Sequence, residues 1–157
     1  MTDLKAAYEL AIQNEIKSQN LYKLLARSFA GNPDIAQTFS RLVPMEALHE
    51  EKLHTLVQQK FPQAVLKLDP TLHHTLPAEE LKDADKVLEF AISREELARD
   101  NYLQLAADTP EPELQALFTD FAAEESNHKT ILQTEILRLD GLMTWFDSSE
   151  LNGMMED

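Results

Sequence analysis

Ala11-Ile12-x-x-Glu15-x-x-Ser18-x-x-x-Tyr22 is the stretch that decides the fold, because the chain repeats it as Ala91-Ile92-x-x-Glu95-x-x-Ala98-x-x-x-Tyr102. Each copy is followed by a Glu-x-x-His motif, which is Glu46-x-x-His49 in the first half and Glu125-x-x-His128 in the second. Spacings of three, four and seven residues place the members of each motif on one face of an α-helix. The repeat therefore predicts two helical hairpins, each of which contributes two carboxylates and one imidazole to a shared interior.

The composition of the 157-residue chain favours a single helical domain, with 43% hydrophobic residues and three glycines. The chain has no cysteine, which excludes disulfides, iron–sulfur clusters and thiolate-bound zinc. Its formal net charge of −14 and the lack of a basic stripe argue against a nucleic-acid partner. Metal cations are the partners that such a chain favours.

The N-terminal residues 1–5 lack the charged and then apolar pattern of a signal segment. No apolar run approaches the roughly 18 residues that a membrane-spanning helix needs. We therefore expect a cytoplasmic protein with no membrane partner.

Four segments repeat apolar residues at the spacing of one helix face. We expect helices over about residues 3–30, 33–61, 83–108 and 112–140. Gly31 and Gly141 each follow the end of a predicted helix, where a glycine can take the left-handed conformation at low cost.

The connections between these helices predict the topology. Two of them are short, so each folds its two helices into an antiparallel hairpin, whereas residues 61–82 form a long connection. An extended chain rises up to ~3.3 Å per residue, so this connection can run the length of a helix. We therefore expect an all-α four-helix bundle over residues 1–141, in which a long crossover joins two hairpins, and a C-terminal tail over residues 142–157.

Four glutamates on the inward faces would each cost several kcal/mol in a bundle core unless their charge were compensated. No lysine or arginine lies on the four predicted inward faces. Two divalent ions would balance four carboxylates, and carboxylates mixed with imidazoles suit iron or manganese better than calcium or structural zinc. We therefore predict that one dinuclear metal site is formed by six residues: Glu15, Glu46, His49, Glu95, Glu125 and His128.

A single Glu-x-x-His pair is more often a solvated helix face than a metal site. Glu51-x-x-His54 is interpreted in that way, because it lies off the apolar face and has no counterpart in the second half of the chain. The spacing of the repeat also indicates which of two adjacent glutamates faces inward: it selects Glu125 rather than Glu124. The adjacent histidines of the crossover, His73 and His74, are interpreted as a solvated pair.

The predicted site resembles the di-iron carboxylate site of the ferritin-like superfamily, especially its rubrerythrin-like branch, over nearly residues 5 to 139. The resemblance implies a ferritin-like four-helix bundle that holds two iron ions, with manganese or a mixed manganese–iron pair as the alternative. It implies that Glu46 and Glu125 bridge the metals. By the same resemblance each metal has one terminal glutamate and one histidine: Glu15 or Glu95, and His49 or His128.

Two tyrosines complete the resemblance. Tyr22 and Tyr102 each lie seven residues after the glutamate of the repeated motif. The resemblance implies that they donate hydrogen bonds to the carboxylates, and they are our catalytic candidates. The other interpretation is ordinary core packing with a satisfied hydroxyl group.

The implied activity is that of a di-iron oxidoreductase that reacts with hydrogen peroxide or O2. Rubrerythrins proper carry a four-cysteine electron-transfer module, which this chain lacks, so an external electron donor is required. They also carry an extra glutamate near the third-helix ligand, where this chain has Ala98. Three alternatives stay open: a ferroxidase or iron-handling protein, a di-iron hydroxylase, and a non-catalytic metal-binding protein.

The tail mixes Trp145 and Phe146 with acidic residues, and we expect it to pack over a bundle end or against a second subunit. A homo-oligomer, most simply a homodimer, is the expected assembly. The identities of the metal, the oxidant and the electron donor do not follow from the residues.

Overall fold

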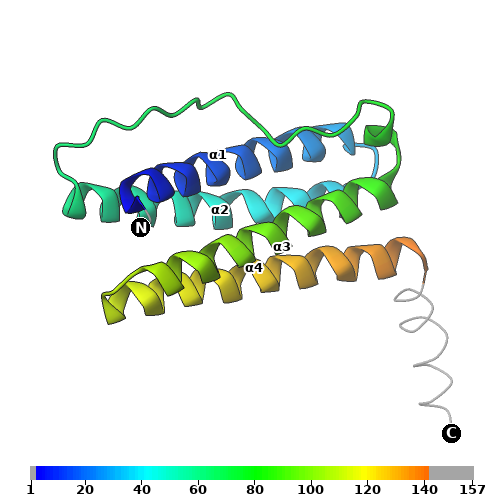
Figure 1. The fold of residues 1–157 in the computed structure, drawn as a ribbon. Coiled ribbons are helices and arrows are strands. Elements are labelled where there is room, and N and C mark those ends of the chain that lie inside the picture. Colours follow the sequence, from blue (N-terminus) through cyan, green and yellow to red (C-terminus); the bar gives the residue numbers. More distant parts are fainter. Residues whose placement is uncertain (1–2, 142–157) are drawn as a thin grey trace, which may run out of the picture.

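The computed structural model describes residues 3–141, and the predicted tail at 142–157 lies outside that part of the chain. Within residues 3–141 the secondary structure is helical, which confirms the predicted all-α class. The long helices and one short 3-10 helix are α1 (Leu4–Ser28), α2 (Pro33–Lys60), η1 (Glu80–Lys82), α3 (Ala84–Asp108) and α4 (Pro112–Leu139). Figure 1 shows α1 with α2 and α3 with α4 as two antiparallel hairpins.

Local sequence signals set the helix ends. The side chains of Asp3, Asn32 and Asp83 each accept a hydrogen bond from a backbone N–H of the first turn of α1, α2 and α3. Gly141 follows α4 with a φ of 85°, as predicted. The prediction for Gly31 is wrong, because α1 ends at Ser28 and Gly31 does not take a positive φ.

The crossover between α2 and α3 lies along α1 (Figure 1). Gln13 donates a hydrogen bond to the carbonyl of Asp69 at 2.9 Å and accepts one from its N–H at 2.8 Å. The amide of Asn20 donates to the carbonyls of Pro70 and Leu72, both at 2.8 Å. These bonds satisfy backbone groups of a segment that has no strand or long helix of its own.

Two apolar clusters form the core, one towards each end of the bundle. The first packs Tyr8 and Ile12 of α1 against Leu53, Phe118 and Phe121 of the other helices. The second includes these residues of all four helices: Leu21, Leu25, Phe39, Leu42, Leu88, Ala91 and Leu132. The glutamates and histidines of the repeated motifs lie between the two clusters, where water is excluded.

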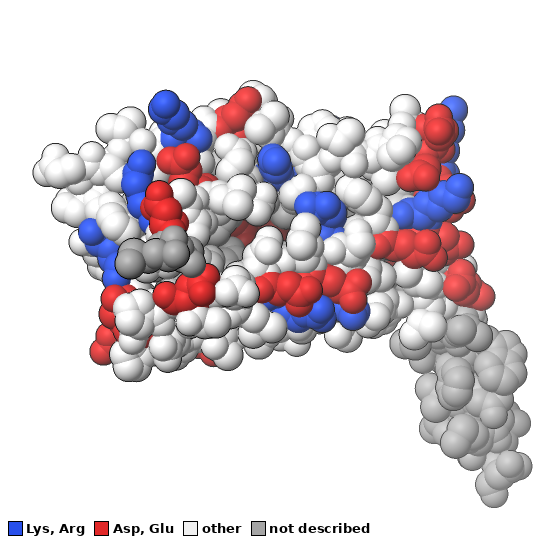
Figure 2. All heavy atoms as spheres, viewed as in Figure 1, with Lys and Arg blue, Asp and Glu red and all other residues white. Residues whose placement is uncertain are grey.

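The surface is charged and mixed. On the face shown in Figure 2, lysine and arginine side chains stand singly or in small groups among acidic ones. In the part of the chain that the structure describes, no helix combines the length and apolar character needed to cross a membrane.

Candidate metal centre

Each of the four long helices directs at least one acidic side chain to the middle of the bundle. Glu15 comes from α1 and Glu95 from α3, while α2 and α4 each contribute a glutamate and a histidine one turn apart, Glu46 with His49 and Glu125 with His128. All six residues are buried, with no more than 4% of the surface of each residue exposed. The structure thus brings together all six residues that the sequence singled out.

The six residues divide into two overlapping groups of four. One group is Glu15, Glu46, His49 and Glu125, and the other is Glu46, Glu95, Glu125 and His128. In each group the potential ligand atoms all lie within 4.8 Å of one another. The two groups share Glu46 and Glu125, so this arrangement offers two adjacent cation positions with two carboxylates common to both.

Each histidine faces a shared carboxylate of the opposite hairpin. His49 Nδ1 lies 2.8 Å from Glu125 Oε1, and His128 Nδ1 lies 2.8 Å from Glu46 Oε1. The other distances are also matched, since His49 Nδ1 is 3.5 Å from Glu15 Oε1 and His128 Nδ1 is 3.5 Å from Glu95 Oε2. The approximate two-fold symmetry of the sequence is therefore present in the geometry.

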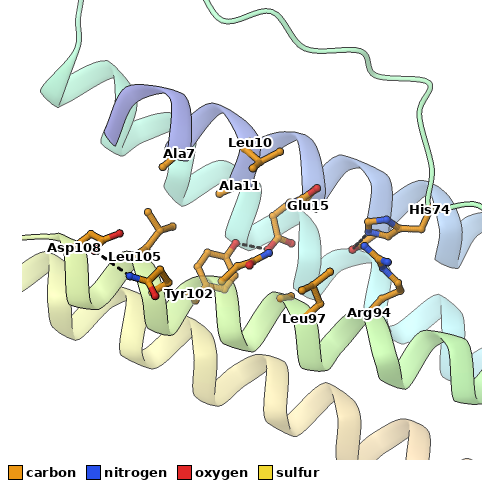
Figure 3. Close-up of a pocket in the computed structure, with 15 residues that line it drawn as sticks. Ala7, Leu10, Ala11, Glu15, His74, Arg94, Leu97, Tyr102, Leu105 and Asp108 are labelled. Atoms are coloured by element: carbon orange, nitrogen blue, oxygen red, sulfur yellow. Dashed lines mark hydrogen bonds between the residues drawn. The ribbon is translucent and has the colours of Figure 1, made fainter. Parts of the chain in front are cut away.

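The two tyrosines donate hydrogen bonds across the gap between α1 and α3. Tyr22 of α1 donates to Glu95 Oε1 at 2.5 Å, and Tyr102 of α3 donates to Glu15 Oε1. Figure 3 shows the second pair, in which the phenol of Tyr102 points to the carboxylate of Glu15. Each bond occupies one oxygen of a glutamate and so restricts the rotation of its carboxylate.

The unpaired atoms of the cluster show that its residues fit a metal. Each residue has one buried oxygen or nitrogen that makes no hydrogen bond of regular geometry, although the two Nδ1 atoms lie close to carboxylate oxygens: Glu15 Oε2, Glu46 Oε1, His49 Nδ1, Glu95 Oε2, Glu125 Oε1 and His128 Nδ1. Buried polar atoms are almost always paired in folded proteins, so six such atoms at one place need an explanation. Converging carboxylate oxygens and imidazole nitrogens suit a metal ion such as iron or manganese.

Electrostatics favours cations in the cluster. Burial raises the pKa of Glu46 and Glu125 well above the ordinary 4.5, and the neighbouring carboxylates raise it further. Burial lowers the pKa of His49, but its close contacts with the carboxylates of Glu125 and Glu15 outweigh burial and raise that pKa to about 11. In the absence of metal, protons therefore stay in the cluster at neutral pH, and a bound cation must displace them.

The surroundings of the histidine Nε2 atoms, which point away from the cluster, differ between the two hairpins. His49 Nε2 forms a hydrogen bond to the carboxylate of Glu124, which lies on α4 and is partly exposed. The repeat places Met45 at the position in α2 that corresponds to Glu124, and a thioether cannot supply the charged acceptor that Glu124 supplies to His49. The sequence analysis correctly placed Glu125 rather than Glu124 inside, but it missed this contact.

Two further residues were missed. Glu135 is 3% exposed and accepts a hydrogen bond from Thr38 Oγ1 at 2.9 Å, away from the cluster. Its position three residues after Leu132 on the inward face was the available signal. His74 is half-buried, and its Nε2 lies 3.2 Å from Ser18 Oγ of α1, so the interpretation of both crossover histidines as solvated holds only for His73.

Comparisons with known proteins agree with this geometry. Residues 8–84 and 86–144 match the protein-family model described as Rubrerythrin. The chain is also similar to a crystal structure of an uncharacterized conserved protein from Magnetospirillum magnetotacticum MS-1, with 26% identity and a TM-score of 0.67. That similarity covers 87% of this chain and 95% of the other. Among curated proteins, no sequence matches.

We predict that the metal-free protein loses stability as the pH rises. The folded pKa values of Glu46, Glu125 and His49 lie above their unfolded values, so the folded state binds more protons than the unfolded chain. Stability is then highest in mild acid and falls through neutral pH towards pH 11. Chemical denaturation of chelator-treated protein between about pH 5 and pH 9 measures this slope.

Matched variants separate the cluster from the general negative charge of the surface. Glu46→Gln removes one titrating group and should flatten the slope by up to about 1.4 kcal/mol per pH unit. Glu51→Gln, at an exposed position of the same helix, should leave the slope unchanged. An equal effect of both substitutions would contradict the prediction.

Proposed function

We propose that this chain, which belongs to the rubrerythrin family, is a di-iron oxidoreductase. It would reduce hydrogen peroxide with electrons from an external donor. The observation that carries the proposal is the set of six buried ligand atoms, one from each predicted residue, that lie together without a hydrogen bond of regular geometry. Iron is the metal that the family implies, and the mixture of carboxylates and imidazoles suits it.

The two overlapping groups support specific roles for the six residues. Glu46 and Glu125 would bridge the two ions, because each belongs to both groups. Glu15 and His49 would complete the ligand set of one ion, because they belong to the first group only. Glu95 and His128 would complete the ligand set of the other ion, because they belong to the second group only. Two ferrous ions supply one electron each, which is the number that reduction of one peroxide to two waters requires, together with two protons.

The protein's own groups would hold this centre ready for reaction. Tyr22 and Tyr102 fix the orientation of Glu95 and Glu15 by hydrogen bonds, so these carboxylates need little reorganisation when an ion binds. The apolar clusters on both sides exclude bulk water from the cluster. Electrons must come from another molecule, because the chain has no cysteine for an iron–sulfur centre.

A second candidate function is hydroxylation of a small organic substrate. One observation favours it, which is a pocket of about 240 Å³ whose lining includes Glu15 and Tyr102. A hydroxylase needs an apolar space next to its metals, and most of this lining is apolar. A ferroxidase would require the same six ligands, so the choice of oxidant must be measured.

We predict that the reconstituted protein holds about two iron ions per chain. Glu46→Ala and Glu125→Ala each remove a proposed bridge, so each should reduce the binding of both ions together. Glu51→Ala, which alters the exposed Glu-x-x-His pair of α2, serves as the control and should retain both. Metal analysis after anaerobic loading measures the content. Loss of no more than one ion in both bridge variants would show that the bridging roles are wrong.

We also predict that the two metal positions differ in affinity. The carboxylate of Glu124 should make His49 a stronger ligand, whereas the corresponding position in the other half of the repeat is Met45. Glu124→Gln keeps the size of the side chain but removes its charge, and should weaken one of two binding steps by about 10- to 100-fold. Cobalt(II) titration followed by absorbance resolves the steps.

Two substitutions sharpen this prediction. Glu96→Gln removes another partly exposed carboxylate, one that pairs with Lys129, and should change neither step. Met45→Glu supplies the missing carboxylate and should bring the two steps closer together. Equal weakening of both steps by Glu124→Gln would argue that the residue acts on the fold rather than on His49.

The choice of oxidant decides between the candidate activities. We expect stopped-flow oxidation of the di-ferrous protein to be faster with hydrogen peroxide than with O2 at equal concentration. A peroxide accepts two electrons in a single turnover, which matches what the centre holds. Faster oxidation by O2 with accumulation of many irons per chain would instead identify a ferroxidase.

A further inference from the structure

The pocket beside the cluster is an elongated space between α1 and α3. Leu10 and Ala11 line it from α1, and Leu97, Ala98 and Leu105 line it from α3. Figure 3 shows that Glu15 and Tyr102 lie in its middle, with Arg94 and His74 at one end and Asp108 at the other. A molecule in this pocket would therefore lie against the carboxylate of Glu15 on one side and be open to solvent on the other.

Arg94 supplies the positive charge in this pocket. Nine buried side-chain nitrogen and oxygen atoms within residues 3–141 lack a hydrogen-bond partner. Six belong to the metal-binding cluster, and two belong to Tyr8 and Thr109, whose side chains interact with each other. The ninth is Nε of Arg94.

No carboxylate forms an ion pair with Arg94 in the described part of the chain, although the protein carries a net charge of −14. Its guanidinium instead lies 6.0 Å from the ring centroid of Phe90. A half-buried guanidinium that lines the pocket without an ion pair can bind an anion that enters the pocket.

His74 contributes a neutral polar group at the same end. Burial lowers its pKa to about 4, and the nearby positive charges of Arg94 and Lys17 lower it as well. The imidazole is therefore uncharged at neutral pH, so Arg94 is the cation of the pocket. One positive charge balances an anion with one negative charge, whereas the second charge of a phosphate dianion would be left uncompensated beside Glu15.

We propose that the pocket between α1 and α3 binds a small organic monoanion, whose carboxylate contacts Arg94 and whose apolar chain lies along Leu97, Ala98 and Leu105. A guanidinium and a carboxylate form charge-assisted hydrogen bonds, so a bound carboxylate would pair the charge of Arg94. The volume of about 240 Å³ is below the range of about 300–1,000 Å³ for drug-sized ligands, so the chain of the anion is short.

Ala98 is the residue that leaves room for the anion. It lies one helical turn after Arg94 on the same face of α3, so the chain of a bound carboxylate would pass directly over it. A larger side chain at this position would fill the pocket between Arg94 and Tyr102. The inference goes beyond the proposed function, because the pocket binds the anion through groups that are not metal ligands.

Hexanoate and its uncharged analogue hexanol test the proposal on metal-loaded protein. Ligand-observed NMR titration should give saturable binding of hexanoate and much weaker binding of hexanol. Arg94→Gln should raise the dissociation constant of hexanoate by about tenfold or more, because a charge-assisted pair is lost. Arg99→Gln is the matched control on α3, since Arg99 already pairs with Asp100 at 3.0 Å, and it should change nothing.

A second variant and a metal assay keep the outcomes distinct. Ala98→Leu should block hexanoate through lost space, while Arg94→Lys, which keeps the charge, should retain part of the binding. The proposal would be overturned if hexanoate did not bind, if hexanol bound equally well, or if Arg94→Gln left hexanoate binding unchanged. The last result would mean that the carboxylate of hexanoate contacts the metals directly. Metal content is measured in every sample, so hexanoate binding to a protein that takes up no metal would reject the proposed function alone.

Discussion

The burial of four carboxylates between two apolar clusters is the constraint on which the rest of this structure depends. The four glutamates are almost completely buried, so each negative charge must be met by a hydrogen bond, a proton or a cation. The two tyrosine hydroxyls satisfy one oxygen of Glu15 and one of Glu95, and the histidines face the shared carboxylates Glu46 and Glu125. The atoms that remain unpaired all point to the same small volume, which is why a pair of metal ions is the simplest completion of the core.

Most of this layer could be predicted from the sequence because it obeys helical periodicity. Inward residues recur at a fixed spacing, the repeat selects Glu125 over its neighbour Glu124, and the long crossover follows from residues 61–82. The all-α fold and the hairpin pairing follow from the same pattern. The prediction for Gly31 failed because α1 ends earlier than its apolar pattern suggested, so the turn needs no left-handed residue.

The missed features share a physical reason, which is that they depend on contacts between elements rather than on spacing within one. Glu124 is partly exposed on its own helix, and only the packing of α4 against α2 brings it to His49. His74 lies in a segment without periodicity, and its position is set by Ser18 and by the hydrogen bonds that hold the crossover on α1. The two halves of the bundle are thus nearly symmetric in their inward residues and different in what surrounds them.

Each group of four ligands takes one member from the other hairpin. The group around His49 needs Glu125 of α4, and the group around His128 needs Glu46 of α2. During synthesis on the ribosome the first hairpin is made long before Glu125, so it cannot close a complete site around an iron ion while the rest of the chain is missing. A metal ion in either group would therefore be held by all four ligands only in a finished chain whose two hairpins have docked.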